Sequence, residues 1–145
     1  MFNWHVAREV GVSLVGPSPR DLIAATTQAD FVSAIRMYMR WLLAKAEALD
    51  TPELQAYAIV TACRALHTCI TGQQTSKEAA ARWAEDRYPE WSESIRAARE
   101  RGRTSPSQRP AANVPISRGL EFVRFAVQEV SPDSELIFCG RRLGS

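Results

Sequence analysis

The stretch "TGQQTSKEAAARWA" (residues 71–84) places a lysine, Lys77, in the first turn of a predicted helix. Thr75 and Glu78 have the T-x-x-E spacing of a capping box, which predicts a helix that begins there and runs to Tyr88. The start of a helix carries partial positive charge, so a cation there is slightly unfavourable. Lys77 is therefore either an exposed lysine tolerated at a small cost, or a group that meets an anion beside the free backbone N–H groups.

A row of polar side chains follows the preceding helix. Thr51 is a good N-cap, Pro52 suits the first helical position and Gly72 suits a left-handed C-cap, so a helix is predicted between them. Steps of three or four residues place these side chains on one face: Glu53, Tyr57, Thr61, Arg64, Thr68 and Thr71. Such a row is typical of a solvated face, and the alternative is a surface that faces a ligand.

Catalytic and metal-binding patterns are absent from the sequence. It contains no glycine-rich phosphate loop, no H-E-x-x-H and no paired-cysteine zinc motif. Cys63 and Cys69 are six residues apart, on different faces of a helix, and Cys139, His5 and His67 add no ligand set. An odd number of cysteines favours free thiols over a disulfide framework. We therefore predict no catalytic residues and no metal site in this chain.

Composition excludes several classes of function. The 145 residues are 46% hydrophobic and 23% charged, with a formal net charge of +2, as in an ordinary globular domain. That charge is too balanced to indicate a nucleic-acid partner, and no apolar run is long enough to span a membrane. The first ten residues carry charge within their apolar stretch, unlike a secretion signal. We expect a cytoplasmic protein that binds neither nucleic acid nor membrane.

The periodicity of apolar residues predicts an all-α fold, a bundle of five to six helices. Helices are expected over about 28–49, 52–71, 76–88, 90–101 and 116–130. The bundle core should occupy residues 1–102, and "RGRTSPSQRPAANVP" predicts a flexible linker over 103–115. A C-terminal helix, 116–131, should pack on the bundle, and residues 132–145 form a tail. An extended stretch is expected over residues 10–15.

Two segments carry a resemblance to a known family. "SLVGPSPRDL", followed by a long helix and then by "TACRALHTCITGQQTSKEAAARWAEDRYP", resembles the C-terminal helical, antibiotic-binding domain of aminoglycoside adenylyltransferases of the streptomycin/spectinomycin type. The resemblance covers roughly residues 5–100 and, more weakly, the helix 116–130. It does not include the family's N-terminal nucleotidyltransferase domain, which supplies the aspartates that hold Mg²⁺ and ATP. The resemblance therefore implies no adenylyl transfer by this chain alone, and ATP and Mg²⁺ only with a nucleotidyltransferase partner.

On the nucleotide side, the resemblance places Lys77 where the family has a nucleotide-contacting lysine. Arg64 matches an arginine of the family's preceding helix, with a structural ion pair as the alternative. Two positions depart from the family. Gln73 stands where a second lysine is common, and an aromatic residue that contacts the nucleotide is replaced around Gly102. Lys77 and Arg64 are the predicted phosphate-binding residues.

On the antibiotic side, Trp41 lies where the family has an aromatic residue that packs on the drug, since an indole face can stack on a sugar and attract an amine. The alternative is a core tryptophan beside Leu42. Asp50 and Glu53 roughly match the family's acidic positions, and the alternative is a solvated turn whose acids suit a helix start. The predicted ligand-binding residues are thus Trp41, Asp50, Glu53 and Arg64.

Three functions follow for comparison. The first is non-catalytic binding of a small cationic, aminoglycoside-like molecule. The second is a helical interaction module that forms a homodimer or docks on a separate nucleotidyltransferase chain, through apolar surface near Phe2, Trp4, Val6 and Val10. The third is an inactive remnant of the family.

Overall fold

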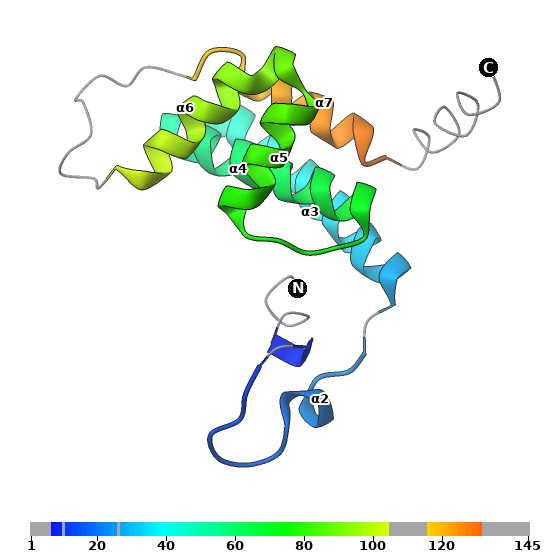
Figure 1. Cartoon of the computed structure of the whole chain (residues 1–145). Coiled ribbons are helices and arrows are strands. Elements are labelled where there is room, and N and C mark those ends of the chain that lie inside the picture. The colour runs from blue at the N-terminus through cyan, green and yellow to red at the C-terminus, as the bar shows by residue number, and fades with distance from the viewer. Residues whose placement is uncertain (1–6, 10, 26, 105–115, 132–145) are drawn as a thin grey trace, which may run out of the picture. The chain divides into compact units, whose positions relative to one another are not determined.

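A computed structural model describes residues 7–9, 11–25, 27–104 and 116–131 of the chain (Figure 1). These residues fall into two compact units, residues 1–35 and 36–145, and the boundary lies within one long helix. The elements in chain order are α2 (Pro19–Leu22), α3 (Gln28–Leu49), α4 (Pro52–Thr71), α5 (Lys77–Arg87), the 3₁₀ helix η1 (Pro89–Trp91), α6 (Ser92–Arg103) and α7 (Gly119–Glu129). The described residues contain no strand, which confirms the all-α prediction.

Helix α4 is the centre of the second unit, because it packs against α5, α6 and α7. Ala58, Ala62 and Leu66 are fully buried, and the small alanines allow the neighbouring helices to approach closely. Two members of the predicted polar row, Thr61 and Thr68, are also buried. The interpretation of that row as a fully solvated face is therefore wrong, since α4 is covered on several sides.

The predicted limits of α4 are confirmed. The Thr51 hydroxyl accepts a hydrogen bond from the N–H of Leu54 at 3.4 Å, and Pro52 occupies the first helical turn. Gly72 ends the helix in the left-handed conformation, with φ of 72°, and donates its N–H to the carbonyl of Thr68. Local sequence signals were sufficient here because each cap acts within one turn.

The predicted start of α5 is wrong by one residue. Ser76 is the N-cap, and its hydroxyl accepts the N–H of Ala79 at 3.1 Å, so Thr75 and Glu78 form no capping box. The Glu78 carboxylate instead accepts hydrogen bonds from Arg99 and from two further arginines, Arg82 and Arg103. These arginine bonds direct the carboxylate away from the helix start. Lys77 is consequently the first residue of α5.

The last two helices differ slightly from their predicted limits. α6 continues to Arg103, inside the predicted linker, and α7 begins at Gly119, three residues after Ile116. Ile116 is itself buried. The rest of the predicted linker, 105–115, and the predicted tail lie outside the described residues, so the division of the chain into core, linker and tail stays a prediction.

In the first unit, the short helix α2 is capped by the hydroxyl of Ser18. An extended stretch was expected over residues 10–15; of these, residues 11–13 have no regular structure and residues 14 and 15 begin a bend, so residues 11–15 form no strand. Their apolar side chains are strongly exposed, with Leu14 and Val15 both at 94%. Across the described ranges of the chain, no helix has the length and hydrophobicity needed to cross a membrane.

Candidate functional site

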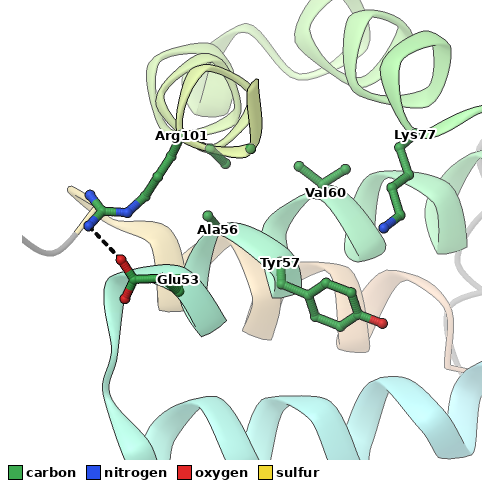
Figure 2. Close-up of a pocket in the computed structure, with 8 residues that line it drawn as sticks. Glu53, Ala56, Tyr57, Val60, Lys77 and Arg101 are labelled. Carbon is green, nitrogen blue, oxygen red and sulfur yellow. Dashed lines mark hydrogen bonds and ion pairs between the residues drawn. The ribbon is translucent and has the colours of Figure 1, made fainter. Parts of the chain in front are cut away.

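A pocket of about 270 Å³ lies between α4, the start of α5 and the end of α6. Figure 2 shows the side chains that surround it. The lining residues come from α4 (Glu53, Ala56, Tyr57, Val60), α5 (Lys77) and α6 (Ala98, Arg101, Gly102). Steps of three and four residues bring the α4 side chains onto one face, so the pocket follows from the helical period.

Small residues keep the pocket open. Ala56 on α4 and Ala98 on α6 each contribute only a methyl group to the lining, and Gly102 has no side chain. A β-carbon added at Gly102 would meet no atom within 4 Å, so the space beside it is empty of protein. This is the position at which the family resemblance indicated a missing aromatic residue.

An ion pair between α4 and α6 closes one end of the pocket. Arg101 Nη2 donates to Glu53 Oε1 at 3.0 Å, as the dashed line in Figure 2 marks. The Arg101 side chain is only 19% exposed, whereas that of Glu53 is 48% exposed. The Nε atom of Arg101 is buried and has no hydrogen-bond acceptor. Glu53 therefore holds the guanidinium in an ion pair, while the carboxylate remains accessible to solvent.

Lys77 lies at the other end of the pocket, on the first residue of α5. Its ammonium group is 5.1 Å from the centre of the Tyr57 ring. The Tyr57 hydroxyl is 2.9 Å from that of Tyr38 on α3. Burial and, to a smaller extent, the hydrogen bond with Tyr57 together raise the pKa of Tyr38 to about 12. The Tyr57 ring and the Lys77 ammonium thus form one edge of the pocket, and Tyr38 contacts Tyr57 from α3.

Trp41 extends this aromatic edge along α3. Its ring stacks on Tyr38 with centroids 5.6 Å apart and an angle of 28° between the planes. Trp41 is 53% exposed, so the alternative that it is a core residue is wrong. The ammonium of Lys45, one turn later, is 4.8 Å from the centre of the Trp41 ring. Trp41, Tyr38 and Tyr57 form an aromatic step that leads from the surface of α3 to the pocket.

The structure brings some of the predicted site residues together and separates others. Glu53 and Lys77 line the same pocket, and Trp41 reaches it through the aromatic step. Asp50 does not line the pocket. It has a φ of 45° in the turn after α3, and its carboxylate accepts a hydrogen bond from Gln55 at 2.7 Å. Arg64 is half-buried two turns beyond Tyr57 and does not line the pocket either.

Arg101 is the site residue that the sequence reasoning missed. The helix that carries it was predicted, but the face that α6 turns toward α4 was not. The spacing of Ala98 and Arg101 with Gly102 was the available signal, since a small-residue face that includes one arginine favours a close helix contact beside a charge. Tyr57 had been placed only in the polar row.

The groups that line the pocket and can bind a ligand are two cations, one carboxylate and the ring of Tyr57. Within the described residues, no three side chains of histidine, cysteine, aspartate or glutamate come together as a metal site would require.

Comparison with known proteins matches residues 21–124 to the family described as "Aminoglycoside adenylyltransferase, C-terminal domain". The match begins within α2 and ends near the middle of α7, and it includes every residue that lines the pocket. No curated protein matches the chain.

Proposed function

The chain belongs to the family of aminoglycoside adenylyltransferase C-terminal domains, as its sequence predicted, and from this premise we propose that it binds a small cationic, aminoglycoside-like molecule. The proposal assigns no adenylyl transfer to this chain alone. The ligand would lie along the aromatic step of Trp41, Tyr38 and Tyr57 and would place an amine near Glu53. Antibiotic resistance is the context that the family implies for such binding.

The observation that carries the proposal is the ammonium of Lys45 at 4.8 Å over the Trp41 ring. An exposed indole that already attracts one ammonium group can attract the amine of a ligand by the same interaction between a cation and a ring. The stacked Tyr38 and the adjacent Tyr57 extend the apolar surface on which a sugar ring could pack. Glu53, at the end of this surface, supplies the carboxylate that a polycation needs.

A second candidate function is phosphate binding at the opposite end of the pocket, and the position of Lys77 favours it. Lys77 and Arg101 supply two cations, and the first N–H groups of α5 lie beside Lys77. Arg64, the other predicted phosphate-binding residue, lies outside the pocket, so Arg101 takes its place in this proposal. ATP and Mg²⁺ would be bound only when a nucleotidyltransferase domain completes the site.

Calorimetric titration with streptomycin and with spectinomycin tests the leading proposal. We expect binding to the wild-type chain, and about tenfold weaker binding to Trp41→Leu, because one cation–ring interaction contributes about 0.5–2 kcal/mol. Met37→Ala is the matched control, since Met37 is an exposed apolar residue one turn away on the same helix. A folded wild-type protein that gives no heat with millimolar drug would refute the proposal.

The Lys77→Ala variant tests whether the two ends of the pocket bind different ligands. This variant should weaken ATP binding, if a partner allows it, and leave drug binding nearly unchanged. Equal loss of both ligands would show that the division of the pocket is wrong.

The alternative function, an interaction module, has some support in the first unit. The predicted apolar surface near Phe2, Trp4, Val6 and Val10 lies outside the described residues. Next to it in the chain, Val12, Leu14 and Val15 are strongly exposed, and exposed apolar patches often mark protein contacts. Self-association or docking on a separate nucleotidyltransferase chain would cover them. Size-exclusion chromatography with light scattering tests this, and a strict monomer at high concentration argues against self-association.

A further inference from the structure

We propose that Arg101 competes with the amine of the ligand for the Glu53 carboxylate. The Glu53–Arg101 pair then determines whether the pocket prefers a cationic or an anionic ligand. This inference rests on the proposed function, because it concerns the ligand that binds beside Glu53. It assigns a selectivity role to a residue on α6 that forms no part of the aromatic step.

The geometry of the pair supports competition. Arg101 Nη2 lies 3.0 Å from Glu53 Oε1, so the guanidinium occupies one oxygen of the carboxylate that a ligand amine would approach. The carboxylate is half exposed and the guanidinium is mostly buried. A ligand from solvent therefore reaches Glu53 first, and it meets the positive field of Arg101 directly behind it.

The remaining charges of the pocket determine the direction of the effect. Lys77 and Arg101 carry two positive charges and Glu53 carries one negative charge, so the pocket is net positive. Removal of the Arg101 charge leaves one cation and one carboxylate, which favours an amine. Removal of the Glu53 charge leaves two cations, which favours a phosphate. A single substitution on either side of the pair should thus shift the ligand preference in opposite directions.

The size of the shift follows from the exposure of the pair. Ion pairs at partly exposed sites contribute modestly, so the competition should cost the ligand about three- to fivefold in affinity. Arg101→Gln is expected to bind streptomycin about three- to fivefold more tightly than the wild-type protein. Glu53→Gln is expected to bind streptomycin more weakly and inorganic pyrophosphate about three- to fivefold more tightly.

A second ion pair of the same unit provides a matched control. Arg124 Nε on α7 lies 2.7 Å from Glu47 Oε1 on α3, both side chains are similarly exposed, and neither lines the pocket. Arg124→Gln and Glu47→Gln therefore change the net charge of the protein by the same amount as the test variants. They should leave both affinities within twofold of wild type.

The experiment is calorimetric titration of the full chain and the four variants with streptomycin and with pyrophosphate at low ionic strength, after circular dichroism has confirmed the fold. Tighter streptomycin binding by Arg101→Gln, but not by Arg124→Gln, supports the inference. If the wild-type protein binds streptomycin and Arg101→Gln binds it no more tightly, the inference is overturned and the proposed function stands.

The two failures can be distinguished. Streptomycin binding by Arg101→Gln alone, with none by wild type, supports the competition and removes the proposed function from the wild-type protein. Absence of binding by both proteins overturns both. Equal gains in Arg101→Gln and Arg124→Gln overturn the inference, because they show an effect of net charge alone.

Discussion

The amide side chain of Gln55 connects the turn after α3 to the segment that leads into α7. Gln55 is 3% exposed, and its Nε2 donates to Asp50 Oδ1 at 2.7 Å. Its Oε1 accepts the backbone N–H of Ile116 at 3.1 Å. We predict that Gln55→Leu, which keeps the size of the side chain and removes both bonds, destabilises the fold.

The magnitude can be worked out from the two bonds. The buried N–H of Ile116 loses its acceptor, which costs about 1–3 kcal/mol. The exposed carboxylate of Asp50 can be solvated by water, so its loss adds about 1 kcal/mol at most. The more apolar leucine returns about 1 kcal/mol. The free energy of unfolding should therefore fall by about 2 kcal/mol, which lowers Tm by about 7 °C in a chain of 145 residues.

Urea unfolding followed by circular dichroism measures this change, and Asp50→Gly is the informative companion. Glycine removes the bond from Gln55 but relieves the positive φ of 45° at Asp50, so the two effects should nearly cancel. A Gln55→Leu variant within 0.5 kcal/mol of wild type, on the scale of about 0.5 kcal/mol expected for neutral substitutions, would refute the reasoning. Loss of drug binding in a stable Asp50→Gly variant would support the predicted ligand role of Asp50.

Two further predictions concern titration and thiol reactivity. Hydrogen bonding from Arg99, assisted by other arginines, holds the pKa of Glu78 below its ordinary value of 4.5. The contribution of this carboxylate to stability is therefore present above pH 4.5 and is lost as the pH falls further. The Glu78→Gln variant should consequently show a smaller decline in Tm on acidification. Burial raises the pKa of the fully buried Cys63 thiol. In a Cys139→Ser variant, Ellman's reagent should therefore modify Cys69 first and Cys63 only on unfolding. Fast labelling of Cys63 in the folded protein would contradict this.

Local signals in the sequence were enough to predict α4, but they could not choose the start of α5. Thr75 and Ser76 are adjacent and both suit an N-cap. The choice depends on Glu78, whose carboxylate is bound by Arg99 on α6, 21 residues later in the chain. A capping box needs that carboxylate at the helix start, and the contact between α5 and α6 holds it elsewhere. The error thus comes from tertiary packing, which local spacing does not encode.

The pocket residues could be predicted only in part, because some of them depend on tertiary packing. Glu53 and Lys77 were predicted because each has a local signal in the sequence. Glu53 is an acid at a helix start, where the helix dipole favours it, and Lys77 is a cation at a helix start, where the dipole disfavours it. Arg101 was missed because its role depends on which face α6 turns toward α4. Asp50 was predicted because its charge suited the ligand, and no local pattern indicated that Gln55 would hold its carboxylate.

Lys77 and Arg101, the two cations of the pocket, differ in how the fold stabilises their charge. At the first position of α5 its charge is disfavoured by the helix dipole by about 0.3–1 kcal/mol, and no carboxylate of the described residues pairs with it. Arg101, by contrast, lies in the last turn of α6, where the dipole favours a cation, and Glu53 binds it. The fold therefore stabilises one cation of the pocket and leaves the other against the ring of Tyr57. Because an anion beside Lys77 would remove the unfavourable charge at the helix start, the phosphate end of the pocket is the end where ligand binding should also stabilise the fold.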